Sequence, residues 1–167
     1  MDMTRSARSA ATLLVLAVIF VAGLAWAWGK VTEPFPDKAS DPACNDTLFA
    51  AGDKIVPGDV LVSVLNAGDR SGLASDTMSH LVRMGFGKGE IGDTDRIRVP
   101  AQVWAPDPNA PAARLVASYL GKRVPIVDQD SSKPGITVVV NDDFTGVLKG
   151  AADEAVDDDT YVCSPSH

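Results

Sequence analysis

VLVSVLNAGDRSGLASDTMSHLVRMG, residues 60–85, is the stretch that decides the fold. Its first six residues are apolar or β-branched apart from one serine, which predicts a buried strand. The next seven are rich in Asn, Gly, Asp and Ser and are typical of a loop. Leu73, Thr77 and Leu81 then share one face of a helix that Gly85 ends. The stretch predicts a strand, a loop and a helix in succession.

The elements that follow are shorter but carry similar signals. Alternation and β-branched residues predict strands, and Pro111 favours the start of a second helix that Gly121 ends. The further elements are strands at 86–91 and 97–104, a helix at 111–120, and strands at 124–127 and 136–140. The order β-α-β-β-α-β-β predicts an α+β domain whose two helices pack on one face of a small sheet.

Residues 10–29 are uncharged and predominantly apolar, which predicts one transmembrane helix before this domain. Arg5 and Arg8 precede the segment, so the positive-inside rule places residues 1–9 in the cytoplasm and the domain outside the cell membrane. The alternative is a cleaved signal peptide, because Ala25-Trp26-Ala27 resembles a cleavage site. In both cases we expect the remaining chain to be exported.

The exported part divides by composition into three segments. Residues 30–58 contain several prolines and predict a stalk and lead-in, residues 59–150 hold the folded domain, and residues 151–167 are expected to be a solvated acidic tail. Cys44 and Cys163 lie near the two ends of this part. An oxidising compartment favours a disulfide between them, and two unpaired thiols are the alternative.

The chain has 167 residues, of which 46% are hydrophobic, and a net charge of -7. Because the few charges at the amino terminus are mostly basic, the exported part is more acidic still. An acidic surface repels nucleic acid, which excludes it as a partner class. The sequence predicts neither a cofactor nor a metal. The G-x-G-x-x-G match at 87–92 follows a helix instead of a strand, and the acidic stretch at 128–132 lacks the glycine and glutamate of a calcium loop.

Catalytic residue types are scarce. His80 is the one histidine inside the domain, and we interpret it as a solvated side chain on its helix. Asp142 and Asp143 form a carboxylate pair, but neighbours on a strand end point to opposite faces, so a solvated strand terminus is the better interpretation. The sequence therefore predicts that the protein is not an enzyme.

The candidate binding surface is the loop between the first strand and the first helix, together with one aromatic residue. Asn66 can adopt left-handed geometry and Ser71 can cap the helix. The free backbone N–H groups from Gly72 onward could hold a phosphate or carboxylate, with Arg70 adjacent. A plain capped turn is the alternative. Trp104 can contact glycans or proteins if exposed, and a buried Trp104 is the alternative. The full set is Asn66, Ala67, Arg70, Ser71, Gly72 and Trp104.

The chain resembles the LytR C-terminal domain family over residues 60–144. The resemblance rests on VSVLNA at 62–67, SGLA at 71–74, LVRMGF at 81–86 and VVVNDDF at 138–144. The family pattern has glycine where this chain has Asn141. With AQVWAPDPN at 101–109 and the predicted anchor, the chain is similar to the stand-alone, Cei-like envelope-integrity proteins.

This resemblance implies a non-enzymatic, membrane-anchored module that supports cell-envelope integrity. In larger LytR/CpsA/Psr proteins the domain accompanies a separate catalytic domain that attaches glycopolymers to the wall. The implied partner is a cell-wall glycan, a glycopolymer ligase or a peptidoglycan-synthesis protein. Two alternatives stay open: a lipid or small-ligand carrier with a groove between helix and sheet, and a hydrolase or transferase that uses His80.

Overall fold

A computed structural model describes residues 17–20 and 44–166 of the chain. The chain divides into two units, residues 1–40 and 41–167, and the fold described here is that of the second. Residues 17–20 are helical, but most of the predicted membrane segment at 10–29 lies outside the described residues. Among the residues that are described, no helix has the length and apolar character needed to cross a membrane.

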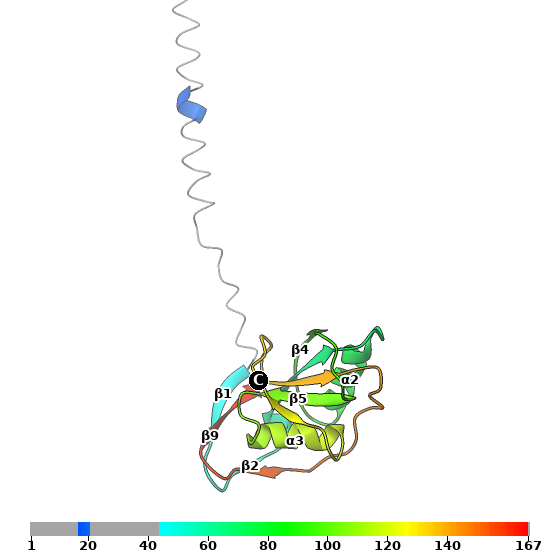
Figure 1. Ribbon diagram of the computed structural model, residues 1–167. Helices are drawn as coiled ribbons and strands as arrows, with labels where there is room; N and C mark the ends of the chain where they lie inside the picture. Colours follow the sequence, from blue (N-terminus) through cyan, green and yellow to red (C-terminus); the bar gives the residue numbers. More distant parts are fainter. Residues whose placement is uncertain (1–16, 21–43, 167) are drawn as a thin grey trace, which may run out of the picture. The chain divides into compact units, whose positions relative to one another are not determined.

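A five-stranded mixed sheet forms the centre of the second unit (Figure 1). Its strand order is β4-β3-β7-β5-β6; β3 pairs in parallel with both β4 and β7, and β5 runs antiparallel to β7. The elements between residues 59 and 150 are β3 (Leu61–Asn66), α2 (Leu73–Arg83), β4 (Gly87–Asp93), β5 (Ala101–Ala105), α3 (Pro111–Leu120), β6 (Ile126–Asp128) and β7 (Ile136–Val140). The predicted α+β class and element order are confirmed.

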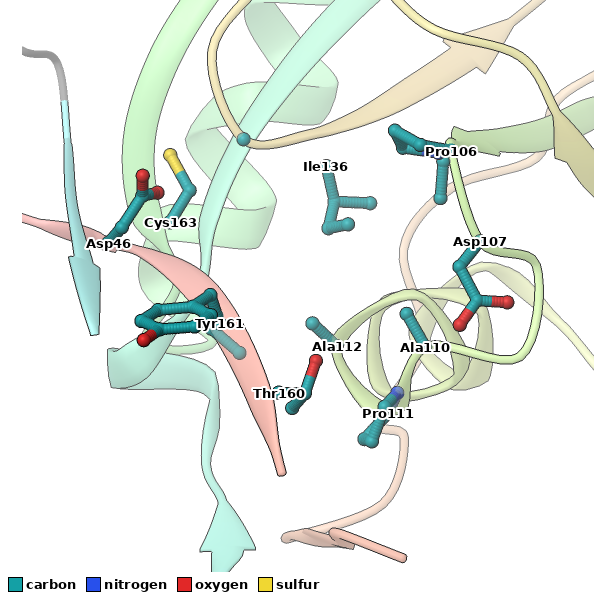
Figure 2. A pocket seen from close by; sticks show the side chains of 13 residues that line it. Asp46, Pro106, Asp107, Ala110, Pro111, Ala112, Ile136, Thr160, Tyr161 and Cys163 are labelled. Carbon is teal, nitrogen blue, oxygen red and sulfur yellow. The ribbon is translucent and has the colours of Figure 1, made fainter. Parts of the chain in front are cut away.

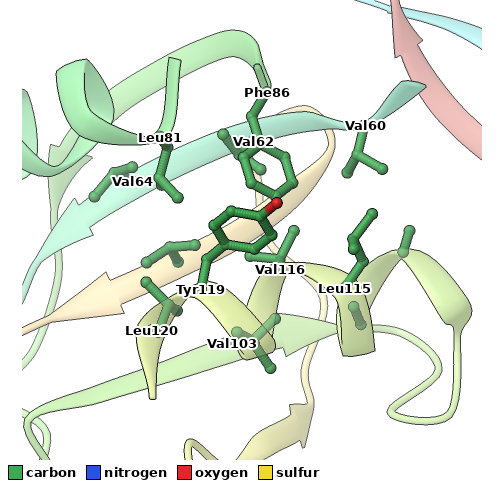
Figure 3. Packing of buried hydrophobic residues seen from close by; sticks show 14 of the residues in the cluster. Val60, Val62, Val64, Leu81, Phe86, Val103, Leu115, Val116, Tyr119 and Leu120 are labelled. Atoms are coloured by element: carbon green, nitrogen blue, oxygen red, sulfur yellow. The ribbon is translucent and has the colours of Figure 1, made fainter. Parts of the chain in front are cut away.

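Both helices pack on one face of this sheet, as the sequence predicts. Alternate residues of β3, including Val62, point into a cluster that also holds Leu81 of α2 and Leu115 of α3 (Figure 3). Val138 of β7 belongs to the same cluster. Phe86 and Tyr119 close this core edge to face, with ring centroids 4.9 Å apart. A smaller cluster on the other face joins residues of β3, β5 and β7.

One predicted strand is shorter than expected. The sequence predicts a strand at 97–104, but β5 begins at Ala101. Pro100 has no N–H to donate to a ladder and restricts the residue before it, so residues 97–100 approach the sheet as an irregular segment. Asn141 fixes this segment: its backbone N–H donates to the Pro100 carbonyl at 3.0 Å, and its Nδ2 donates to the Ile97 carbonyl at 3.3 Å.

The predicted solvated tail at 151–167 is wrong. Residues before and after the sheet domain pair with each other in two short antiparallel ribbons, β1 with β9 and β2 with β8. We call these four strands the clasp: β1 (Cys44–Phe49), β2 (Lys54–Ile55), β8 (Glu154–Ala155) and β9 (Thr160–Pro165). Figure 1 shows β1 and β9 side by side at the edge of the domain. Val156 and Val162 are buried in the main core, so the acidic residues 157–159 form only the turn between two strands.

The clasp also changes the interpretation of the lead-in. Residues 44–58, expected to be part of a stalk, hold β1, β2 and a short 3-10 helix, η1 (Pro57–Asp59). In the β1–β9 register Cys44 opposes Pro165 and Asp46 opposes Cys163. Cys163 is not a free thiol. A disulfide from Cys163 to Cys44 stays a prediction.

Candidate functional site

The loop between β3 and α2 is organised by Asn66 at the end of β3. The Asn66 Oδ1 accepts a hydrogen bond from the Gly68 N–H at 3.1 Å, and its Nδ2 donates to the Arg70 carbonyl at 3.1 Å. The side chain thus bridges both ends of the turn, and Asn66 is 9% exposed. Among the described residues only glycines have positive φ, so the left-handed geometry expected for Asn66 does not occur.

Asp142, which follows β7, supplies the anion of this loop. Its Oδ2 accepts from the Asp69 N–H at 3.0 Å and its Oδ1 from the Arg70 N–H at 2.9 Å. These two backbone hydrogen bonds, that of Asp69 first, lower the pKa of Asp142, and the charges of Arg70 and Arg96 act in the same direction. The loop therefore already holds a carboxylate of the chain itself, on the amides of Asp69 and Arg70 and not on those from Gly72 onward that the sequence offered to a phosphate or carboxylate.

The start of α2 differs from the expected cap. Gly72, with φ of 81°, occupies the N-cap position and no side chain caps the helix, so the prediction of a Ser71 cap is wrong. Close approach also constrains Gly68, because an added Cβ would collide with the Asp142 carboxylate. Arg96 pairs with Asp69 on the outside of the loop. The loop is therefore held by the close approach of Gly68 to Asp142 and by the hydrogen bonds that the Asp142 carboxylate accepts.

A groove of about 580 Å³ extends from this loop along α2. Arg70 and Asp142 lie at its loop end, and Arg70 Nη2 donates to the Phe144 carbonyl at 3.4 Å. We call this hollow the α2 groove; it is lined by Arg70, Leu73, Asp76, Thr77, His80 and the segment 142–147. Its floor is apolar, because Leu73 and Phe144 are buried, while Asp76 and His80 are exposed on its wall.

Trp104 belongs to a different surface. It packs with Leu65, Ala67 and Val139 on the sheet face away from α2 and α3, so it is part of the smaller cluster. Its indole Nε1 is buried without a hydrogen-bond partner, and so is the hydroxyl of Thr137, its register partner on β7. The structure thus brings Ala67 and Trp104 into one cluster. It places Trp104 away from the α2 groove.

The packing of the domain bears on two further hypotheses, the ligand carrier and the hydrolase. The space between the helices and the sheet, where a lipid or small ligand was considered, is filled by the main core cluster, which gives the carrier hypothesis no support. His80, the residue considered for hydrolysis, is exposed and lines the α2 groove beside Asp76 and Thr77. An exposed position in the wall of a groove is compatible with ligand binding as well as with catalysis.

The role of Asp142 is the main feature that sequence reasoning missed. The parallel register of β3 and β7 aligns Asn66 with Val140, so the residues just after both strands meet at one edge of the sheet. The sequence shows two adjacent carboxylates at that point but does not show which strand lies next to it. If the β3–β7 pairing had been known, it would have placed Asp142 beside the loop that follows β3.

Comparisons with known proteins agree with the resemblance in the sequence. The family model described as LytR cell envelope-related transcriptional attenuator (LytR_C) matches residues 59–144. No curated protein matches the chain. A solved structure that matches is the soluble domain of a conserved hypothetical secreted protein, an Rv2700 ortholog, from Mycobacterium marinum. It is 21% identical, covers 61% of this chain and 79% of its own, and has a TM-score of 0.47.

Proposed function

Because this chain belongs to the LytR_C family, which is related to the cell envelope, we propose that it is a non-enzymatic binding module of the cell envelope. In this proposal residues 10–29 anchor it to the cell membrane by a single pass, with residues 1–9 in the cytoplasm. The domain lies outside and supports envelope integrity by binding a wall glycan or a wall-assembly enzyme.

The α2 groove is the observation that carries the proposal. Most of its lining belongs to residues 59–144, the part of the chain that the family shares. A volume of about 580 Å³ lies within the range of sites that hold small molecules or segments of polymers. The groove is therefore a concave surface built largely by the family domain.

The chemistry of the groove suits a polar, extended ligand. Arg70 offers a cation at one end and Asp76 offers an anion along α2, and Thr77 also lines the groove. Groups of both signs above an apolar floor can hydrogen-bond a sugar chain or match a mixed-charge protein surface. Asp142 faces the same groove while it holds the loop, so the wall that presents Arg70 is fixed before a ligand arrives.

Site-specific photo-crosslinking in cells tests this function. A photoreactive amino acid replaces His80, which lines the groove, and in a matched control it replaces Ser79, which is exposed on α2 but does not line it. The expected result is a covalent product from position 80 and none from position 79. Recovery of wall glycan identifies a tether, and recovery of a ligase or peptidoglycan-synthesis protein identifies an accessory subunit.

The second test measures envelope permeability in a strain that lacks the gene. The proposal expects a deletion strain with raised envelope permeability, restored by the full-length chain and by the Arg83→Ala variant, whose substitution lies on α2 outside the groove. An Asp76→Ala, His80→Ala double variant should fail to restore it. Unchanged permeability together with equal crosslinking from positions 79 and 80 would remove the proposal.

A further inference from the structure

A second hollow adjoins the α2 groove at the segment that follows β7. It has a volume of about 310 Å³, and residues 143–145 line both hollows. Its other walls are residues 99–101 at the start of β5, Leu120 at the end of α3 and residues 123–125. We call it the Arg123 hollow. Because the two hollows share residues 143–145, one extended ligand can occupy both.

Thr77 of α2 carries a hydroxyl that the fold leaves unused. It lines the α2 groove and is only 4% exposed, and its hydroxyl has no hydrogen-bond partner among residues 17–20 and 44–166. The hydroxyl of Thr137 also lacks a partner but is fully enclosed, whereas that of Thr77 is not. A buried hydroxyl costs free energy unless it is hydrogen-bonded. The Thr77 hydroxyl therefore indicates a ligand that forms a hydrogen bond inside the groove.

Charged groups of both signs line the two hollows without partners. The guanidinium of Arg123 and the carboxylates of Asp76 and Asp143 form no ion pair or hydrogen bond with any residue in the described ranges. Asp142 and Arg70 differ, because contacts within the domain already engage both. Complementary charges select the partner that fits a site. The free charges here match a ligand with an anionic and a cationic group close together.

The hollow between the clasp and α3 lacks this combination. Figure 2 shows its two acidic residues, Asp46 and Asp107, on opposite sides, and its lining contains no Lys, Arg or His. Of the buried polar side chains in the described part of the chain, none lines it. The α2 groove and the Arg123 hollow therefore give the stronger case for a specific polar ligand.

The two hollows suit a peptide better than a sugar chain. Among the described residues that line them, Phe144 is the one aromatic residue, and it is 6% exposed. They thus offer no aromatic face to a sugar ring. Apart from Arg123 and Asp143, the Arg123 hollow is lined mainly by aliphatic side chains and prolines, which fit an apolar side chain. A carboxylate next to an apolar side chain is what the carboxyl terminus of a polypeptide presents.

From these features we infer that the two hollows bind the carboxyl terminus of another protein, in which a basic residue precedes an apolar last residue. The terminal carboxylate binds Arg123, and the last side chain enters the Arg123 hollow. The basic side chain passes Asp143 into the α2 groove, where its stem contacts the apolar floor and its charge meets Asp143 and Asp76. The Thr77 hydroxyl donates to a peptide carbonyl. This inference rests on the proposed function, since the α2 groove is part of the site, and it selects a protein over a glycan.

The test uses fluorescence polarisation with the full-length chain in detergent and a labelled peptide, fluorescein-Gly-Gly-Gly-Lys-Val, whose carboxyl terminus is free. A carboxyl-terminal amide removes the anion, norleucine in place of lysine removes the cation, and D residues at the last two positions reverse the handedness. The parent peptide is expected to bind at least tenfold more tightly than each of these three versions, because each loses a charged contact or its geometry.

Charge variants of the protein locate the two ends of the peptide. Arg123→Gln should abolish the preference for the free acid over the amide, and Asp143→Asn should reduce the preference for lysine over norleucine. Each variant is expected to weaken binding of the parent peptide about tenfold, which is typical for the loss of a hydrogen bond between charged groups. Lys122→Gln and Asp95→Asn are the matched controls, because both residues are exposed and line neither hollow.

Thr77→Val separates binding from folding. Valine has nearly the same shape but no hydroxyl, so it should weaken binding of the parent peptide about fivefold. The urea midpoint should stay unchanged or rise, because no internal hydrogen bond is lost. Thr137→Val is the control: it also removes an unpartnered buried hydroxyl, but Thr137 lines neither hollow, so binding should not change.

Four results would overturn the inference. They are equal binding of the acid and amide peptides, unchanged affinity in both charge variants, tighter binding of the D peptide, and no binding of the parent peptide at concentrations on the order of 1 mM. If the peptides fail while the photoreactive residue at position 80 recovers wall glycan, the proposed function stands and this inference alone falls.

Discussion

The family domain and the clasp are held together by different physics. In the family domain β3, β7 and the two helices bury aliphatic side chains, of which Val62, Val138 and Leu115 are fully inaccessible. In the clasp most side chains of β1 are exposed, and only single residues such as Val162 reach the core. The first region is stabilised mainly by apolar burial, and the second by strand pairing and polar contacts with α3.

The polar contacts of the clasp are concentrated on α3. Arg114 binds Glu154 and Asp157, the Tyr119 hydroxyl donates to the Ala151 carbonyl at 2.8 Å, and the Ala151 N–H donates to Ser118 Oγ at 3.0 Å. The carboxylates of Glu154 and Asp157 hold the guanidinium charged, so the pKa of Arg114 is raised above its ordinary value despite partial desolvation. Because the clasp buries less apolar surface than the family domain, we expect it to open before the sheet unfolds.

The predicted Cys44–Cys163 disulfide gives the largest expected effect. The two residues are more than a hundred positions apart, and a loop of that length corresponds to about 4 kcal/mol in the chain-entropy model. A Cys44→Ser, Cys163→Ser double variant should lose up to that amount, measured by urea denaturation. Reductant should destabilise the native chain equally and leave the double variant unchanged. Alkylation of two thiols in the oxidised native chain would contradict the prediction.

Leu115→Ala tests the family domain. Leu115 is fully buried between α3 and the sheet, so its truncation leaves a cavity and should cost about 3 kcal/mol. We expect a lower urea midpoint and faster hydrogen exchange in β3 and β7 as well as in the clasp, because the clasp packs on α3. Leu148→Ala, at an exposed leucine, is the control and should change the midpoint little. Equal losses for the two variants would contradict this view of the core.

Arg114→Met tests the clasp alone. Methionine keeps much of the alkyl stem but removes the hydrogen bonds to Glu154 and Asp157, which should cost about 1–2 kcal/mol because the pair is only partly buried. The Val156 N–H, which donates to the Asp53 carbonyl at 3.0 Å, should exchange about tenfold faster. Exchange in β3 and β7 should stay unchanged.

Lys122→Met is the matched control for Arg114→Met. Lys122 is exposed just after α3 and pairs with no described residue, so exchange in the clasp should not change. Faster exchange throughout the five-stranded sheet in Arg114→Met would show that the two regions open as one unit. That result would end the distinction between them.

The same distinction explains what the sequence could predict. β3, α2, α3 and β7 carry their own signals, namely β-branched runs, helical periodicity and glycine stops, and their bounds agree with expectation to within about two residues. Residues 44–49 pair with 160–165 across most of the chain, and β8 has only two residues. No local pattern encodes such pairing, and the run of aspartates at 157–159 favoured a tail.

The sequence indicated the loop that carries part of the candidate site but not the contacts that hold this loop. Asn66 and Arg70 do lie at a loop that borders a groove. That Asp142 occupies the amides of this loop follows from the parallel neighbour of β3, which is a tertiary fact. Trp104 was assigned to the same surface from its residue type, but β5 places it in the cluster on the other sheet face.

Asp142→Asn should give the smallest and most local effect. The folded pKa of Asp142 lies below the ordinary value of 3.8, so the charged form is favoured in the native state. Its contribution is therefore complete above that value and is lost as the pH falls through the lowered folded pKa. In the native chain the Asp69 and Arg70 amides should exchange slowly down to this range, and in the variant they should exchange faster at every pH.

Asp143→Asn is the control for this change, because the carboxylate of Asp143 lies next to Asp142 in the sequence but accepts neither the Asp69 nor the Arg70 amide. If Asp142→Asn loosens the loop while exchange of the Val156 N–H stays unchanged, the family domain contains a polar element that opens independently of the clasp. Additive losses in an Asp142→Asn, Arg114→Met double variant would follow, since the two sites share no partner. Non-additive losses would mean that the β3–α2 loop and the clasp are coupled, so that a ligand in the α2 groove would affect opening of the clasp.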